Sequence, residues 1–528
     1  MGQGAFSLTV NSTAGGLTTA ITAAGGNLST VTDLTVTGTI DARDFKTMYN
    51  DMTVLSVLDL SAASIVEYNG YEGIVPGYSW NFQNEMPSFN VSFKGKQSLT
   101  SIICPVSLTA FGGFQDCKSL ISVTLPSGIT RIPDSAFSGC IGLNSINIPS
   151  KVTEIAAHAF SGCIGLTSIT IPSSVSTIID NSFFNCSAFI SVDPNNAGFS
   201  SHEGVFYNKL QTILKECPIS KTGSYILPAT VTTINYQAFY HCIGLSSVTL
   251  PSSVNFIGGS AFEGCLGLNS VILPNGLTSL SSMTFSNCTG LTSIILPNTL
   301  KSIGLSAFNG CTGLTNINIP NAVTSISDQV FYGCTGLTSI IIPNGVTAIG
   351  NATFFGCSGL TSVTIGSGVT TIADQAFDNC VNLKTIYSLN TTPPTLGSGC
   401  FTNIAVFDPT KLIQPILSAI TDVYVPTDDA VTGYKGNFYW ISWFPGAIIK
   451  KGAPSSITNL PNNQLKVYAT QSAIIIDGTS AGETVVIYNI NGIMLQTIQS
   501  QGERLTIPVE HNSIYLVKTS NKTVKVKM

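Results

Sequence analysis

A unit of 23 residues recurs along most of this chain and constrains the fold more than any other feature. Eleven of the 14 cysteines mark it, and neighbouring members of this set are 23 residues apart except for one step of 56, which is 23 plus 33. They are Cys117, Cys140, Cys163, Cys186, Cys242, Cys265, Cys288, Cys311, Cys334, Cys357 and Cys380. A fixed period of about 20–29 residues is typical of a solenoid, in which each repeat forms one coil and stacks on its neighbours.

Each coil begins with an alternating apolar segment that ends at a proline. In one coil, Ile294 and Leu296 alternate with Ser293 and Ile295, and Pro297 follows. Side chains alternate between the two faces of a strand, and proline ends a strand because it offers no N–H to the ladder. The repeat therefore predicts one short strand per coil, with one pair of side chains inside and the other outside.

Two further positions of the repeat predict the core and the turn. A phenylalanine lies three residues before each cysteine of the row, from Phe114 to Phe377. Stacked along a solenoid, these rings would form a continuous aromatic core, each burying about 150–250 Å². The residue directly before each cysteine is Gly, Asn, Asp or His, which tolerate positive φ most readily. We therefore expect a left-handed backbone position in every coil.

The row of cysteines can be interpreted as reactive or as inert. Adjacent coils would place the thiols about 5 Å apart, a distance that permits a disulfide. However, 11 cysteines in one row cannot all pair, and cysteine packs well as a small buried apolar residue. Zinc needs four converging ligands, whereas the row does not converge and the four histidines are scattered. We expect buried free thiols, with no metal and no other cofactor.

Composition excludes several classes of function. Charged residues make up 9% of the chain, against about 25% in an average protein. The 22 Lys and Arg do not exceed the 27 Asp and Glu, which argues against nucleic-acid binding by phosphate neutralisation. No run of about 18 apolar residues predicts a membrane span. Catalytic signatures such as G-x-S-x-G and H-E-x-x-H are absent, so we expect no enzyme.

The start and the end of the 23-residue repeat divide the chain into four parts. Residues 1–97 lack the 23-residue register and are expected to cap the N-terminal end, residues 98–400 to form the solenoid, and residues 401–453 to form a C-terminal cap and linker. The 33 extra residues predict a hairpin insertion at about 193–218, which turns near Asn208 and projects from the solenoid. In residues 454–528, short alternating segments separated by turns predict a small all-β sandwich.

Two rows of outward strand positions are the candidate binding site. The first row, five residues after each cysteine, is small and polar, and the second, two residues further on, is partly apolar. One interpretation is that small residues simply suit close packing and repeat duplication; the other is an extended binding surface, which solenoids often provide. The candidate ligand-binding residues are Ser247, Ser270, Ser293, Asn316, Ser339 and Ser362 in the first row and Ile272, Ile295, Asn318 and Ile341 in the second.

The pattern L-x-x-I-x-I-P…A-F-x-x-C resembles the BspA-like leucine-rich-repeat family of bacterial surface proteins over residues 99–400. The insertion, with residues 204–207, and residues 423–426 are also similar to segments of that family. The resemblance implies an α/β leucine-rich-repeat solenoid in a secreted or surface-attached adhesion protein of host-associated, Bacteroides-like bacteria. No signal peptide is visible after Met1, which suits either a cytosolic protein or one whose signal peptide has been removed. With the resemblance, we expect removal and a monomer at the cell surface or outside the cell.

The C-terminal tail resembles the sorting domains of type IX secretion cargo. Residues 486–492 and 514–517 carry this resemblance. The glycine that usually precedes the tyrosine motif is replaced by Ser513, with Ile514 between it and the tyrosine. The resemblance implies a sorting domain in residues 454–528, and the alternative is a stalk or packing domain.

These features predict a non-enzymatic adhesion or binding protein that presents the outward strand face to a host or microbial macromolecule. The alternative is a glycan-binding module for carbohydrate capture, which predicts exposed aromatic side chains. Tyr236, Tyr240, Tyr332 and Phe355, on the turn side of the coils, are the candidates for this second function.

Overall fold

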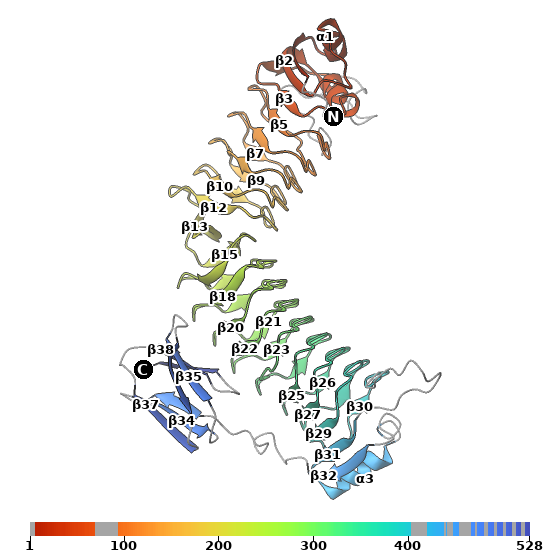
Figure 1. Ribbon diagram of the computed structural model, residues 1–528, viewed down its shortest axis with the longest axis vertical. Coiled ribbons are helices and arrows are strands. Elements are labelled where there is room, and N and C mark those ends of the chain that lie inside the picture. Colours follow the sequence, from red (N-terminus) through yellow and green to blue (C-terminus); the bar gives the residue numbers. More distant parts are fainter. Residues whose placement is uncertain are drawn as a thin grey trace. The chain divides into compact units, whose positions relative to one another are not determined.

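The computed structural model describes residues 6–68, 93–402, 420–437, 440 and 447–452, together with the strands between residues 466 and 527. The chain forms two units, Met1–Gly452 and Ala453–Met528. The first unit contains the repeats and is built of stacked coils (Figure 1).

Parallel strands from successive coils form the main sheet of the first unit, which runs in several segments. Neighbouring coils pair in the 23-residue register, so Ser247 lies opposite Ser270, and Ser270 opposite Ser293. Ile294 and Leu296 are buried whereas Ser293 and Ile295 are exposed, which confirms the predicted orientation of the strand. The strands are β1 (Ser7–Ser12), β2 (Asp33–Ile40), β3 (Val57–Asp59), β4 (Ala63–Ile65), β5 (Ser101–Ile103), β6 (Ser122–Thr124), β8 (Ser145–Ile146), β10 (Ser168–Ile171), β12 (Phe189–Val192), β16 (Gly223–Ile226), β18 (Leu245–Thr249), β20 (Ser270–Ile272), β22 (Ser293–Ile295), β25 (Ser339–Ile342), β27 (Ser362–Ile365), β29 (Thr385–Ser388), β31 (Asp422–Val425) and β32 (Ile448–Lys451).

A second parallel ladder follows the proline of each coil and was not predicted. Its strands are two residues long and fall on the V-T-x-I part of the repeat. They are β7 (Arg131–Ile132), β9 (Glu154–Ile155), β11 (Thr177–Ile178), β17 (Thr233–Ile234), β19 (Phe256–Ile257), β21 (Ser279–Leu280), β23 (Ser302–Ile303), β24 (Ser325–Ile326), β26 (Ala348–Ile349), β28 (Thr371–Ile372) and β30 (Thr395–Leu396). Residues 93–402 are all described and contain no helix, so the helical part of the predicted α/β class is wrong for the coils.

The turn of each coil explains why no helix forms there. All 11 residues that directly precede the repeat cysteines have φ between 55° and 72°, which confirms the predicted left-handed position. A second left-handed position, two residues before each repeat phenylalanine from Phe137 onward, was not predicted. It is occupied by Ser135, His158, Asn181, Gln237, Ser260, Met283, Ser306, Gln329, Ala352 and Gln375, with φ between 50° and 65°. Two such positions in one turn break the run of negative φ that a helix requires.

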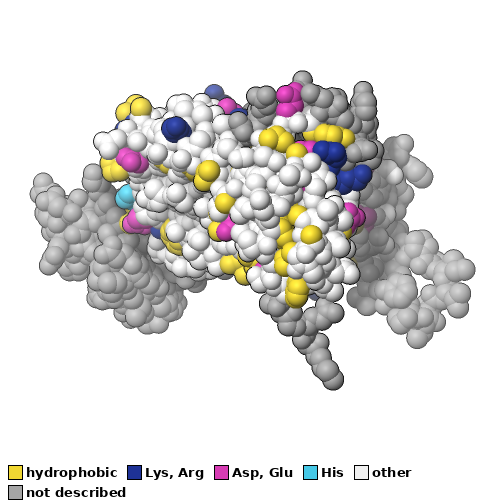
Figure 2. Space-filling model, turned by 90° about the horizontal axis from the view of Figure 1, so that it is seen from above, with side chains coloured by type: hydrophobic (Ala, Val, Ile, Leu, Met, Phe, Trp, Pro, Cys, Tyr) yellow, Lys and Arg dark blue, Asp and Glu magenta, His cyan; other side chains and the backbone are white. Residues whose placement is uncertain are grey.

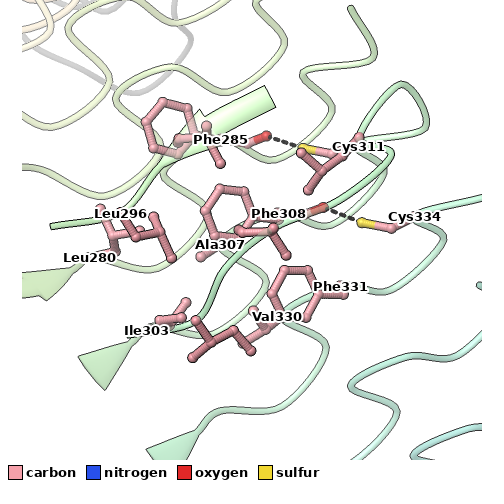
Figure 3. Packing of buried hydrophobic residues seen from close by; sticks show 14 of the residues in the cluster. Leu280, Phe285, Leu296, Ile303, Ala307, Phe308, Cys311, Val330, Phe331 and Cys334 are labelled. Atoms are coloured by element: carbon pink, nitrogen blue, oxygen red, sulfur yellow. Dashed lines mark hydrogen bonds between the residues drawn. The ribbon is translucent and has the colours of Figure 1, made fainter. Parts of the chain in front are cut away.

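The phenylalanine rings stack through the core in two runs, and Figure 3 shows Phe285, Phe308 and Phe331 of the second. Ring centroids of successive coils lie 4.8–5.7 Å apart and the rings are within 15° of parallel, from Phe114 to Phe183 and again from Phe239 to Phe401. Between the runs, Phe206 meets Phe183 edge-on, at 73°. The prediction of one continuous aromatic core is therefore wrong at the insertion.

All 14 cysteines are buried and free, as expected for small apolar side chains packed in a row. The thiol of Cys311 donates to the carbonyl oxygen of Phe285 in the preceding coil, and that of Cys334 to Phe308, both at 3.1 Å (Figure 3). Burial raises the pKa of the Cys357 thiol to about 12, so the nucleophilic thiolate is disfavoured. The row therefore contributes packing and a weak hydrogen-bond ladder.

The insertion contains three strands, β13 (Phe199–His202), β14 (Val205–Asn208) and β15 (Ile213–Glu216). β14 pairs antiparallel with both neighbours, and the turn that begins at Asn208 confirms the predicted hairpin. The Asn208 side chain shapes this turn, because its oxygen accepts from the N–H groups of Thr212 and Ile213, each at 2.9 Å. β15 pairs in parallel with β17, so the predicted projection is partly wrong: the last strand of the insertion returns to the stack.

The insertion also divides the hydrophobic core. One cluster of buried residues extends from Val10 to Phe206 and the other from Val205 to Trp440. The two clusters meet at neighbouring residues of β14, whose side chains point to opposite faces of the strand. The solenoid thus has two cores in series.

Helices occur near the two ends of the first unit. They are α1 (Leu17–Ala23), α2 (Ala42–Lys46), the π-helix η1 (Thr47–Asp51) and α3 (Asp428–Gly436). In the N-terminal part, the buried Asp44 carboxylate accepts from three backbone N–H groups, those of Gly15, Leu17 and Asp41. At the other end, the indole of Trp440 donates to the Pro394 carbonyl at 3.0 Å and packs against Phe401, the last ring of the stack.

The second unit consists of antiparallel strands. They are β33 (Lys466–Ala469), β34 (Ala473–Thr479), β35 (Thr484–Asn489), β36 (Met494–Gln499), β37 (Glu503–Pro508), β38 (Ile514–Lys518) and β39 (Thr523–Lys527), arranged as β33-β34-β37 and β36-β35-β38-β39. Their presence agrees with an all-β unit, whereas the sandwich and the likeness to sorting domains stay predictions.

Candidate binding surface

The first row of candidate residues lies on the outward side of the main sheet. Ser270, Ser293, Asn316 and Ser339 are exposed, and Ser247 and Ser362 are half-buried. Strand pairing aligns Ser247, Ser270 and Ser293 in one segment of the sheet and Ser339 with Ser362 in the next. Ser247 donates a 3.0 Å hydrogen bond to Ser224 in the preceding coil, so part of this hydroxyl row is satisfied within the sheet.

The second row is more apolar than the spacing from the cysteines predicts. Ile272 and Ile295 are each 41% exposed, and Ile341 is half-buried. Register places Ile226 in the same row, opposite Thr249, and it is 67% exposed. The row continues through Tyr387, which pairs with Tyr424 of β31. We call this set the apolar row; it comprises Ile226, Ile272, Ile295, Ile341, Tyr387 and Tyr424.

Two tyrosines and an ion pair end the apolar row. The rings of Tyr387 and Tyr424 stack with centroids 5.1 Å apart and planes 18° from parallel. Lys450 Nζ lies 5.7 Å from the Tyr424 centroid and 2.7 Å from Asp422 Oδ1. The Lys450 ammonium lowers the pKa of the Asp422 carboxyl through this hydrogen bond. These contacts hold both rings in fixed orientations at the end of the sheet.

The coil that carries Asn316 and Asn318 departs from the prediction of one strand per coil. Both side chains are exposed, but no strand is assigned there, and the main sheet ends at β22 and resumes at β25. Asparagine is depleted in strands because its side chain competes for backbone hydrogen bonds. The predicted face is therefore divided at these two residues.

The insertion changes which residues face outward near it. β12 places Phe189 opposite Ser168 and Ser191 opposite Thr170, so Ser191 belongs to the second row and Phe189, 41% exposed, takes its place in the first. Phe189, Ile226 and Tyr424 were not predicted, because their distances from the nearest repeat cysteine differ from the regular spacing. Strand register, rather than distance from a cysteine, identifies them.

The surface of the coils carries little charge. Figure 2 shows charged side chains scattered over a mostly uncharged face. Among the described residues, no group of three or more His, Cys, Asp or Glu could hold a metal ion. Within the same residues, none of the helices is long and apolar enough to cross a membrane. The arrangement offers hydroxyl groups, apolar side chains and two stacked rings for recognition.

Comparison with known proteins gives one family match and several solved structures. The family described as the BspA type leucine rich repeat region matches residues 82–190, 110–226, 215–338 and 324–416. The chain is similar to a leucine-rich repeat protein from Bacteroides ovatus, with 24% identity over 72% of this chain and 90% of that one and a TM-score of 0.48. A leucine-rich repeat protein from Eubacterium ventriosum is 26% identical over 53% of this chain and 83% of that one, with a TM-score of 0.46. A leucine rich cell surface protein from Faecalibacterium prausnitzii is 28% identical over 59% of this chain and 84% of that one, with a TM-score of 0.42. No curated protein matches the chain.

Proposed function

Because this chain belongs to the family of BspA-type leucine-rich-repeat proteins, we propose that it is a non-enzymatic adhesion protein of the cell surface. In this proposal it binds a host or microbial protein through the outward face of the main sheet, between β16 and β32. The apolar row is the observation that carries the proposal.

A line of aligned apolar side chains differs from ordinary surface exposure. Single exposed apolar residues are common on soluble proteins and need no explanation. Here, Ile226, Ile272 and Ile295 are 41–67% exposed and occupy the same register position of the parallel strands β16, β20 and β22, with Thr249 of β18 between the first two. With about 4.8 Å between strands, the positions from Ile226 to Tyr424 span about 40 Å, and polar residues interrupt the row at Thr249, Asn318 and Thr364. Serine and threonine hydroxyls border it, which gives the apolar centre and polar rim of a protein interface.

The low charge of this face decides how it recognises a partner. Between Thr222 and Phe377 the charged residues are Glu263, Lys301, Asp328 and Asp374. Association therefore gains little from electrostatic steering, and affinity comes from shape, apolar burial and hydroxyl hydrogen bonds. Binding should consequently change little with salt concentration.

The test replaces Ile272 and Ile295 together by serine. Burying what each side chain still exposes contributes on the order of 1 kcal/mol, so the double variant should bind about tenfold or more weakly. Binding of labelled protein to cultured epithelial cells and to bacterial cells, followed by flow cytometry, measures the change.

A matched control uses two isoleucines of similar exposure off the strand face. Ile141 and Ile164 are 42% and 49% exposed and directly follow repeat cysteines on the turn side. Ile141→Ser with Ile164→Ser should leave cell binding unchanged. Equal losses in the two double variants, or no loss in Ile272→Ser with Ile295→Ser, would refute the strand face as the binding surface.

A further inference from the structure

The strand β1 forms the edge of the main sheet at the N-terminal end of the first unit. Figure 1 shows α1 and β2, which follow β1 in the chain, at this end of the coils. The Phe6 carbonyl accepts the Asp33 N–H of β2 at 3.3 Å, so Phe6 and every second residue after it direct their backbone groups towards β2. Ser7, Thr9 and Asn11 therefore direct theirs to the outer edge of the sheet.

The outward backbone groups of β1 have no partner among the described residues. Neither the N–H nor the C=O of Ser7, Thr9 or Asn11 takes part in a hydrogen bond there, and all three side chains are exposed. Each residue offers one donor and one acceptor. A row of such groups along a sheet edge is a template for pairing with another strand.

This edge also lacks the devices that usually prevent such pairing. Proteins protect sheet edges with very short strands, bulges, prolines or lysines. β1 is six residues long and pairs with β2 without a bulge, whereas the main-sheet strands after β2 have two to five residues. Residues 1–32 contain no charged side chain and no proline. The edge is therefore open in both its geometry and its chemistry.

The rest of this end coil is uncharged as well. α1 lies in the same coil and exposes Thr18, Thr19, Thr22 and Ala23. The terminal coil of a solenoid normally has a polar outer face that keeps it in solution. Two identical surfaces that carry charge repel each other, because the same charges meet. A face without charge avoids this repulsion and can approach its own copy.

The opposite edge of the main sheet has the protection that β1 lacks. β32 is the last strand there and carries Lys450 and Lys451. Their ammonium groups lie 2.7 Å from Asp422 and 2.8 Å from Asp428. Pairing of two β32 edges would bring these lysines together, and lysine is a common guard of edge strands. The contrast points to the N-terminal edge as the site of association.

The aromatic side chains of the alternative glycan function already have ring partners within the chain. The pairs are Tyr332 with Phe355, Tyr240 with His241 and Tyr236 with Phe256. The outward backbone groups of β1 are therefore the stronger candidates for contact with another molecule.

We propose that β1 is a self-association site, at which two copies of this chain pair edge to edge and antiparallel about a two-fold axis at Thr9. Thr9 then lies opposite Thr9 of the second copy, and Ser7 opposite Asn11. Every outward N–H and C=O of the three residues gains a partner in this register. Leu8, which is half-buried, packs beside Val10 of the second copy.

The pattern of β1 favours its own copy over a strand of another protein. From Ser7 to Asn11 the residues are polar, apolar, polar, apolar and polar, an order that reads the same in both directions. Antiparallel self-pairing therefore matches polar with polar and apolar with apolar side chains at every position. An isologous contact of this kind closes after two copies.

The proposed pair has a consequence for binding. A two-fold axis perpendicular to the sheet turns the outward faces of both main sheets to the same side, so that a pair presents two faces and gains avidity on a surface with many copies of a partner. The site lies at the end of the unit, away from β16–β32, and does not depend on the proposed function. It departs from the monomer that the sequence led us to expect.

Sedimentation velocity of the full chain over about 1–100 μM tests the pair, a range suited to a small interface. We expect the mass to rise with concentration from the 55.4 kDa of one chain towards twice that value. Thr9→Lys puts two ammonium groups opposite each other at the axis and should weaken association about tenfold or more. Thr9→Glu should do the same, and an equimolar mixture of the two variants should associate again because opposite charges then meet.

Thr35→Lys is the matched control. Thr35 lies opposite Thr9 on β2, and its backbone is already paired on both sides, with β1 and with β3. In the proposed pair the two substituted residues are three strand spacings apart, about 14 Å, which exceeds the screening length of about 8 Å at physiological salt. This variant should associate like the wild type.

Hydrogen exchange of the wild type, resolved to single amides, gives a second measurement that needs no variant. The Thr9 amide should be protected at high concentration and exchange freely at low concentration, whereas the Val10 amide, which faces β2, should be protected at both. A single-chain mass at every concentration, undiminished association of Thr9→Lys, or no recovery in the mixture would each overturn the proposal. Protection of the Thr9 amide at both concentrations would overturn it too, because a segment of the same chain would then cover the edge.

Discussion

Phe308 is the position at which the packing of the solenoid can be tested most directly. Its side chain is fully buried, and its ring lies 5.6 Å from those of Phe285 and Phe331, at 5° and 4° from parallel (Figure 3). Replacing a buried phenylalanine by alanine costs about 3–5 kcal/mol. Here the neighbours cannot collapse into the cavity, because backbone hydrogen bonds from Phe285 to Ala307 and from Phe308 to Val330 hold the coils in place. We therefore expect a loss in the upper half of that range for Phe308→Ala.

The loss should also be local, which determines the assay. Coils of a solenoid contact only their neighbours, so native-state hydrogen exchange should show weakened protection around Phe308 and little change around Phe137. Phe355→Ala is the control, because this ring is half-buried and its removal should cost about 1–2 kcal/mol. If Phe308→Ala stays within about 1 kcal/mol of the wild type, the stacked rings are not a main source of the stability of the coils.

Three further results are expected. The 14 thiols should resist iodoacetamide in the folded protein at mildly alkaline pH and react after denaturation, as mass spectrometry can count; labelling of Cys334 in the native state would contradict its burial. Burial raises the pKa of the Glu216 carboxyl in the folded chain to about 8 from an ordinary value of 4.5, so the folded chain holds the extra proton between these values. Its contribution to the free energy of unfolding should therefore fall as pH rises from about 4.5 to 8, by at most about 1.4 kcal/mol per pH unit. Urea titrations at several pH values should show that Glu216→Gln removes this dependence. A pH profile of the variant equal to that of the wild type would refute the assignment. Met283 has φ of 57° and is 40% exposed, so Met283→Val should cost about 1–2 kcal/mol in urea titrations, because a β-branched residue is strained there.

The features that could be predicted are those set by residue types that recur at the same position of every coil. The alternation of Ser293, Ile294, Ile295 and Leu296 requires a strand with a buried side, and a row of phenylalanines at one phase requires a core. Restriction of one position to Gly, Asn, Asp and His reflects a backbone angle that these residues tolerate best. The outward rows followed from the same alternation, although their role in binding stays a proposal.

The features that were missed depend on contacts between coils. The second ladder uses strands of two residues, such as Ser302–Ile303, which are too short to show alternation. The second left-handed position accommodates Met283 and Ala352, residues with no preference for positive φ, because hydrogen bonds to the next coil impose the angle. Phe189, Ile226 and the surroundings of Glu216 depend on how the register resumes after the insertion, and no periodicity in the sequence predicts that.

The hydrogen bonds between coils have a consequence for how such a chain changes over generations. The thiol of Cys334 reaches the Phe308 carbonyl one coil back, and the Phe308 N–H reaches Val330 one coil forward. Because every bond extends to an adjacent coil and ends at a position that the next copy repeats, a duplicated 23-residue segment brings its own partners with it. Gene duplication can therefore lengthen the solenoid by one coil at a time without changes to the two ends. Selection can consequently change the length of the solenoid separately from the residues on its surface.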